Sequence, residues 1–302
     1  MNYSKLTVKQ YTSKLNKLKD MKIDVAKCEN AKALYDYLKT FDLADTSIRI
    51  YLQAILWSDK NENTAFKKDA SEIISQISKT ERDERGNNIL QNAQKVNYID
   101  WNEVLNVYET LKGLKRKSRK DAFNYLLVSL YVLFPPRRIA DYGEMKILEL
   151  NGENLNKYIH KGLVSEETSD NYYVKGERVF IFNRYKTNKK MIQKNGKKKA
   201  AYKQQLFKIS DELETVIEDY IKYVNLKGGD SLLLGISGET LTRTLNSIFY
   251  KYTRKRVSVN ILRHSYITHM MNQEKYNYNE MNDIARKMGH SINSQMQYYK
   301  NI

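Results

Sequence analysis

One segment of this sequence constrains the fold more than any other. Residues 121–134, DAFNYLLVSLYVLF, are apolar on nearly every side of a helix, and such a helix must be buried inside a larger unit. Pro135 and Pro136, the only prolines in the chain, end it, because proline lacks an N–H and clashes with the preceding turn. The sequence therefore predicts a central helix surrounded by other elements.

The length and the distribution of apolar residues predict two domains. A chain of 302 residues is too long for one comfortable core. Residues 1–82 contain runs in which apolar residues recur at helical spacing behind capping residues, which predicts a small helical domain. Residues 83–97 are polar and include Gly86, so we expect a linker there. Residues 98–302 form the predicted second domain.

The second domain combines helices with a small amount of strand. Val174 and residues 179–182 flank Gly176, a pattern typical of a β-hairpin. From Asp211 onward the pattern returns to helices up to the C-terminus. We therefore expect a mainly α fold with a small β-hairpin or sheet.

The charge of the chain predicts a polyanionic partner. Lys and Arg number 52 against 35 Asp and Glu, which leaves a net charge of +17. Basic runs at residues 112–120, 186–203 and 251–256 all lie in the second domain, and they favour a surface that binds DNA or RNA. The alternative is a solubilising surface with a disordered loop around residues 195–196.

Several classes of protein are excluded or disfavoured. No apolar run approaches the ~20 residues that cross a bilayer, and the mean hydropathy is −0.69, which argues against a transmembrane protein. The first residues do not form a secretory signal, so we expect an intracellular location where the target DNA resides. Cys28 is the only cysteine, which excludes intramolecular disulfides and disfavours cysteine metal sites. The histidines show no metal-binding spacing, and we expect neither a metal nor a cofactor.

The end of the chain carries the residues with chemical potential. Arg263 lies near a predicted helix start, where backbone N–H groups favour an anion, and a guanidinium can hold a phosphate with two parallel hydrogen bonds. Gly289 is predicted to end the next helix and to place His290 in a turn. Tyr299 follows nine positions after His290, although one tyrosine among 24 means little alone.

Taken together, four short motifs resemble the signature motifs of the tyrosine recombinase family, also called the phage integrase family. They occur in the family's order as Arg138-Ile139-Ala140-Asp141, Lys186 after the predicted hairpin, Asn260-Ile261-Leu262-Arg263-His264, and Gly289-His290-Ser291 followed by Tyr299. The predicted N-terminal helices resemble the family's core-binding domain, so the resemblance covers nearly the whole chain. It implies an N-terminal helical core-binding domain followed by a catalytic domain.

The resemblance implies a metal-independent, site-specific recombinase or integrase that cleaves and rejoins double-stranded DNA, as a tetramer on the DNA. Transfer of a phosphodiester to a tyrosine places extra negative charge on the non-bridging oxygens, and side chains must meet that charge. Arg138 and Arg263 are implied to clamp the phosphate, while His290 and Asn260 add hydrogen bonds.

The remaining implied roles concern bond exchange and support. Tyr299 is implied to form a 3′-phosphotyrosine link, and Lys186 to protonate the departing 5′ oxygen. Asp141 is expected to orient an arginine or histidine, and His264 to form hydrogen bonds beside the site.

Neighbouring residues leave alternatives for three of these assignments. Arg138 could instead be a surface cation, since Arg137 next to it is equally placed for the site. Lys189 or Lys190 could serve in place of Lys186. Tyr298 could replace Tyr299, but the spacing favours Tyr299, with Tyr298 packing behind it.

The chain departs from the family in two places. Asn260 stands where the family usually has histidine, so this position cannot carry a proton. Only residues 300–302 follow Tyr299, where many relatives carry a segment that docks on a neighbouring subunit; the contact is made differently here, or the chain has been truncated.

Two other functions remain as hypotheses. A type IB topoisomerase would use similar residues to relax DNA as a monomer, and a DNA-binding protein that has lost catalysis would be consistent with Asn260. The abundance of Lys, Asn, Tyr and Ile favours an AT-rich genome, such as that of a virus or mobile element.

Overall fold

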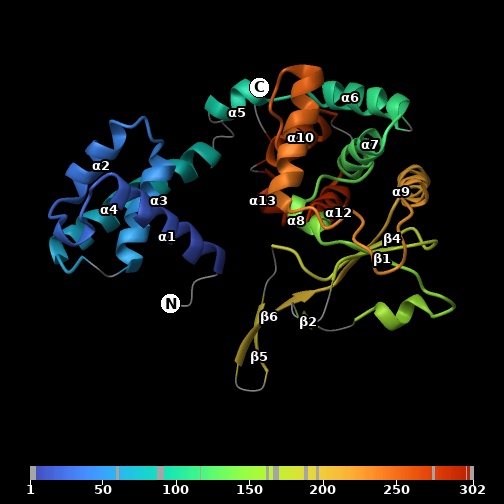
Figure 1. Cartoon of the computed structure of the whole chain (residues 1–302), viewed down its shortest axis with the longest axis horizontal. Coiled ribbons are helices and arrows are strands. Elements are labelled where there is room, and N and C mark those ends of the chain that lie inside the picture. Colours follow the sequence, from blue (N-terminus) through green and yellow to red (C-terminus); the bar gives the residue numbers. More distant parts are fainter. Residues whose placement is uncertain are drawn as a thin grey trace. The chain divides into compact units, whose positions relative to one another are not determined.

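The computed structural model describes residues 5–58, 61–86, 92–115, 117–160, 163–165, 170–186, 190–194, 197–273, 276–296 and 298–299. Its internal contacts divide the chain into two compact units, Met1–Ile89 and Leu90–Ile302. Both units are largely helical, and the described strands belong to the second (Figure 1). This confirms the predicted fold class, mainly α with a small sheet.

The described residues of the N-terminal unit form four helices and one short 3-10 turn, Val25–Lys27. The helices are α1 (Lys5–Asp20), α2 (Ala31–Lys39), α3 (Asp45–Ser58) and α4 (Thr64–Gly86). Helix α3 packs against both α1 and α4, and it contributes Ile48 and Leu52 to a core that also contains Leu18 and Phe66. The apolar positions of these helices therefore meet in one small core, as helical periodicity requires.

Helical structure continues into the segment that the sequence predicts as a linker, residues 83–97. Helix α4 runs to Gly86, and α5 spans Asn92–Asn97. The reason is that Glu, Arg and Lys are good helix formers when their side chains are in water. Where the structure describes residues 83–97 they are helical, and their role as a linker stays a prediction.

The C-terminal unit surrounds the buried helix that the sequence predicts. Besides α5, its described helices are α6 (Trp101–Leu114), α7 (Arg119–Val132), α8 (Ile139–Gly143), α9 (Asp211–Val224), α10 (Gly238–Thr253), α11 (Val259–Asn272), α12 (Tyr278–Lys287) and α13 (Ile292–Met296). Helix α7 is that buried helix, and it packs against α6, α9 and α10 (Figure 1). Leu126, Leu127 and Leu130 are completely buried, which confirms the prediction.

A four-stranded sheet packs into the same core. Its strands β1 (Lys146–Leu148), β3 (Tyr172–Val174), β4 (Val179–Phe182) and β7 (Gln205–Lys208) follow one another in that order. Strands β1 and β3 are parallel, and the other two pairs are antiparallel. The β3–β4 pair is the predicted hairpin, and Gly176 has a φ of 78° in its turn. Strand β4 leads the chain toward Lys186.

A second sheet contains β2 (Leu163–Ser165), β6 (Lys197–Lys203) and β5 (Lys190–Lys194), in that order. Both of its pairs are antiparallel. A 3-10 turn at Leu155–Tyr158 precedes β2. Across the described helices, none combines the length and the apolar character that a membrane span requires.

Candidate active site

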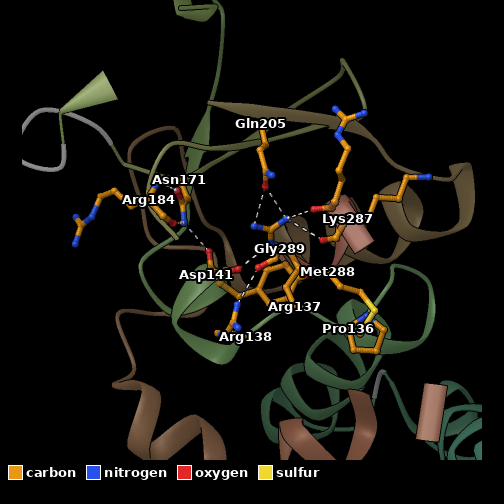
Figure 2. Close-up of polar contacts among 12 residues, drawn as sticks. Pro136, Arg137, Arg138, Asp141, Asn171, Arg184, Gln205, Lys287, Met288 and Gly289 are labelled. Carbon is orange, nitrogen blue, oxygen red and sulfur yellow. Dashed lines mark hydrogen bonds and ion pairs between the residues drawn. The ribbon is translucent and has the colours of Figure 1, made fainter. Parts of the chain in front are cut away.

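Three arginine side chains donate to backbone carbonyls at the C-terminal end of α12, and Figure 2 shows two of them, Arg137 and Arg138. Arg137 Nη1 donates to Lys287 O at 2.8 Å and to Arg286 O at 3.4 Å. Arg263 Nη1 donates to Met288 O at 2.9 Å, and Arg138 Nη1 donates to Gly289 O at 2.9 Å. The last carbonyls of a helix have no partner within it, and they form the negative end of its dipole. The end of α12 therefore fixes three positive groups that would otherwise repel one another.

Gly289 allows the chain to turn sharply at this point. Its φ is 69°, and it directly follows Met288, the C-cap of α12, so it occupies the predicted position after the helix. An added Cβ would lie 2.9 Å from Arg137 Nη2. The N–H of His290 then donates to Ala285 O at 3.0 Å, which closes the turn. Glycine is thus required here both by the backbone conformation and by the space beside Arg137.

Arg263 on α11 is completely buried and retains free hydrogen-bonding capacity. Nη1 donates to Pro136 O at 2.6 Å and to Met288 O. Nε and Nη2 are buried and have no hydrogen-bond partner among the described residues. Burial lowers the pKa of Arg263, and the charge of the Tyr298 hydroxyl and its hydrogen bonding to the guanidinium oppose this effect, but a guanidinium stays charged in proteins. Two unpartnered buried donors on a cation mark a place where an anion can bind.

His290 is held in a defined protonation state. Nδ1 lies 3.0 Å from Ser291 O, and since a carbonyl only accepts, Nδ1 carries the hydrogen. Burial, followed by the charge of Arg263, lowers the pKa of His290 to about 3. The ring is therefore neutral near pH 7, and its Nε2 is an acceptor. Within the described part of the chain this buried Nε2 has no partner, so it is available to accept a proton.

Tyr298 lies directly against these groups. Its ring stacks on His290 with 5.3 Å between centroids and 17° between planes, and Arg263 Cζ lies 4.7 Å from its centroid. His264 Nδ1 donates to the Tyr298 carbonyl at 2.9 Å. The sequence predicts that Tyr298 packs behind Tyr299, whereas its ring lies over Arg263 and against His290.

Tyr299 is half-buried and packs against the apolar side chains of α11 and α12, together with Tyr298. That apolar cluster consists of Ile267, Met270, Ile284 and Met288. The role of Tyr299 as the nucleophile stays a prediction.

Two predicted site residues stand apart from this group. Asn260 is exposed in the first turn of α11, three residues before Arg263 and thus near the same face of the helix. Lys186 is exposed four residues after β4. No described hydrogen bond or ion pair joins either of them to the arginines or to His290. The alternative Lys189 and the side chain of Lys190 lie outside the described residues.

Arg137, which the sequence leaves as an alternative to Arg138, turns inward. It is completely buried, and its Nε donates to Asp141 Oδ2 at 2.8 Å. Burial raises the pKa of Asp141, and Arg137 opposes this effect. The spacing of four residues between the two, directly after a buried helix, is a signal that could have identified the pair. Gln205, which accepts from Arg137, carried no comparable signal.

The described residues hold no group of three or more His, Cys, Asp or Glu that could bind a metal ion. The groups at the end of α12 are instead the guanidinium groups of three arginines and the neutral ring of His290. The guanidinium groups can bind an anion, and His290 Nε2 is a neutral base beside them.

Comparisons with known proteins give similarity in fold alone. No protein-family model and no curated protein matches the chain. A crystal structure of XerA recombinase has a TM-score of 0.41 and 12% identity, over 99% of this chain and 88% of that one. A post-cleavage complex of XerH site-specific recombinase bound to palindromic difH substrate has a TM-score of 0.47 and 14% identity, over 89% and 68%. At these values the similarity is one of fold, and it gives no information about the chemistry of this chain.

Proposed function

We propose that this protein is a site-specific DNA recombinase that cleaves and rejoins strands through a tyrosine joined to a 3′ phosphate. One observation carries the proposal. Arg138, Arg263 and His290, which lie far apart in the sequence, meet at the end of α12 next to the tyrosine pair. Their order and types are those of the tyrosine recombinase signature motifs.

The arginines supply what phosphoryl transfer requires. As the tyrosine oxygen bonds to phosphorus and the bond to the 5′ oxygen breaks, negative charge grows on the non-bridging oxygens. Arg263 offers two buried N–H groups that have no described partner, and the half-buried Arg138 is held by one nitrogen at Gly289 O. Positioned guanidinium groups stabilise this charge without rearranging during the reaction.

His290 is proposed to take the proton of the attacking phenol. Asn260, in the position where the family has histidine, can only form hydrogen bonds. The Nδ1 of His290 is committed to Ser291 O, so the neutral ring presents Nε2 as the acceptor. Once the phosphate is bound, its negative charge favours the protonated ring. This would supply the base that Asn260 cannot provide.

Lys186 and Tyr299 complete the proposed reaction. Lys186 gives a proton to the departing 5′ oxygen, and Tyr299 is the nucleophile on the basis of its spacing from His290. Since the Tyr298 ring lies over Arg263, we propose that it moves away when the phosphate enters. No metal or cofactor takes part in these steps.

The partner is proposed to be double-stranded DNA, bound by four copies of the chain. The net charge of +17 supports a polyanionic partner. We assign DNA clamping to residues 1–82 and catalysis to residues 98–302. The protein would act inside the cell, where its DNA lies, and its composition supports an origin in a virus or a mobile element.

A nicked suicide duplex that carries the DNA flanking the gene tests this function. Wild-type protein should form a covalent protein–DNA adduct, Tyr299→Phe should form none, and Tyr298→Phe, the matched control, should retain it. Equal adduct from Tyr299→Phe would refute the nucleophile. Absence of adduct with every flanking duplex would refute the function. Relaxation of one plasmid without exchange between two would indicate a topoisomerase instead.

A further inference from the structure

Arg137 is a buried cation that reaches three separate segments of the C-terminal unit. Its Nε bonds to Asp141 in α8, and its Nη1 bonds to the carbonyl of Lys287 at the end of α12. Both Nη1 and Nη2 donate to Gln205 Oε1 in β7, each at 3.1 Å. Figure 2 shows the guanidinium between these acceptors. No exposed surface remains on the side chain, so it cannot contact DNA directly.

The flat face of the guanidinium rests on the sheet. Arg137 Cζ lies 3.8 Å from the ring centroid of Phe182, and Phe182 pairs with Gln205 in the β4–β7 register. The Tyr185 ring lies 5.6 Å from the same atom, one residue before Lys186. Contact with aromatic faces stabilises a cation and fixes the plane in which its N–H groups point.

Packing alone does not explain an arginine at this position. Removing a guanidinium from water is costly, and an apolar residue of similar volume often gives equal or greater stability. What an apolar residue lacks is a rigid set of directional donors. Here those donors hold α8, β7 and the end of α12 at fixed separations. Two of these segments carry groups of the proposed site.

The two ends of this arrangement are next to the proposed phosphate-binding groups. Arg138 follows Arg137 in the chain and bonds to Gly289 O. The carbonyl of Lys287, which Arg137 also binds, lies just before Gly289 and His290. A Cβ added at Gly289 would lie only 2.9 Å from Arg137 Nη2. A shift of Arg137 would therefore move Arg138 relative to His290.

We propose that Arg137 is a positioning residue that keeps Arg138 and the Gly289–His290 turn in register for phosphate binding. The inference rests on the proposed function, since the register matters only if a phosphate reacts there. It assigns to a residue outside the signature motifs a role in the geometry of the site. Small errors in such geometry slow a reaction strongly.

Arg137→Met tests this role with two nicked duplexes. One has an ordinary scissile phosphate, and the other has a methylphosphonate, in which a neutral methyl group replaces one non-bridging oxygen. On the ordinary duplex at saturating DNA, Arg137→Met should slow adduct formation about 100-fold. On the methylphosphonate most of this loss should disappear, because less charge needs the arginine groups. DNA affinity should remain unchanged because Arg137 is buried.

Three further variants separate positioning from general damage. Arg49→Met removes an ion-paired arginine of the N-terminal unit and should affect both duplexes equally. Arg137→Lys keeps the charge and should restore part of the rate. If Arg137→Met does not fold, Gln205→Leu removes the acceptor of two Arg137 N–H groups and should give a smaller loss with the same dependence on the duplex.

The outcomes distinguish the two levels of the proposal. If wild-type protein forms no adduct with either duplex, the proposed function fails. If wild-type protein reacts and Arg137→Met reacts equally fast, the positioning role fails. It also fails if Arg137→Met, or Gln205→Leu in its place, is slowed equally on both duplexes, because that result indicates a merely structural contribution.

Discussion

The arginines at the end of α12 and Lys186 after β4 carry the same charge but are held in very different ways. Arg137, Arg138 and Arg263 donate to backbone carbonyls at fixed distances, and two of them are completely buried. Lys186 is exposed and has no described ion pair. The first region can hold a group in one geometry, and the second can supply charge without fixed geometry.

This difference teaches what each region can contribute to a reaction on DNA. Stabilising a short-lived arrangement of charge requires donors that are already in place. Attracting a long polyanion requires only positive charge near the surface, because released counterions supply much of the free energy. The predictions below therefore place geometric effects in the arginine region and effects on salt dependence in exposed lysines.

The largest expected effect comes from Arg263→Lys. The variant keeps a positive charge but loses the planar donors that reach Pro136 O and Met288 O. Adduct formation should fall by about 1000-fold, measured in a single turnover at saturating DNA. Arg243→Lys, at an exposed arginine paired with Glu239, should keep the wild-type rate. If Arg263→Lys also keeps the wild-type rate, positive charge alone is sufficient, and the arginines do not differ from exposed lysines in their contribution.

Gly289→Ala should lower the free energy of unfolding by about 1–3 kcal/mol. The added Cβ meets Arg137 Nη2 at 2.9 Å, and the backbone has a φ of 69°. Gly113→Ala in α6 is the matched control, since its Cβ has nothing within 4 Å, and it should be neutral or stabilising. Urea unfolding measures both variants. Equal stability of Gly289→Ala and wild type would show that Arg137 can shift away from the added Cβ at little cost.

His290 should make stability depend on pH. Its pKa is about 3 in the folded chain against a usual 6.5, so below pH 6.5 the unfolded chain takes up a proton that the folded chain does not. Stability should therefore fall as pH decreases from 6.5 toward 3, by at most about 1.4 kcal/mol per pH unit.

His290→Gln should remove this part of the slope between pH 6.5 and 5, measured by urea unfolding at each pH. His160→Gln, at an exposed position, serves as the control and should leave the slope unchanged. An unchanged slope in His290→Gln would mean that the ring is less buried than the arginine region requires.

The smallest effect is expected at exposed lysines. Lys117→Gln and Lys120→Gln, each in the basic run of residues 112–120, should each reduce the slope of log affinity against log salt by about 1. Arg137→Met should leave that slope unchanged, because the side chain is buried. Filter binding or fluorescence anisotropy across a salt series measures it. A reduced slope in Arg137→Met would contradict the division between the two regions.

Local features of the fold could be read from the sequence because short-range physics controls them. An apolar run followed by two prolines predicts the buried helix α7, and alternating residues around Gly176 predict the β3–β4 hairpin. Gly289 is recognisable as a helix end because the apolar pattern stops before it. Helix α4 continues into the predicted linker because exposed charged residues can extend a helix without joining a core.

Within the candidate site, residue types were predictable and partners were not. Asp141 and Arg263 stand out by motif, but whether Arg137 or Arg138 turns inward depends on where β7 and α12 lie. Nothing near Gln205 in the sequence marks it as the acceptor of Arg137. The same applies to Tyr298, whose ring reaches Arg263 through the path of the last turns.

By itself, the sequence determined the helical character of the chain, its positive charge and the set of residues available for phosphate chemistry, since these follow from composition and local spacing. Tertiary structure alone decided whether Arg137 or Arg138 is buried, which nitrogen of His290 is free and which tyrosine lies over Arg263. The burial of Arg137 depends on contacts between segments more than 100 residues apart, such as its bond to Lys287 (|i−j| = 150). The surroundings of His290 and Tyr298 depend on how the turns after α12 pack against Arg263. No local pattern encodes the partners of these contacts.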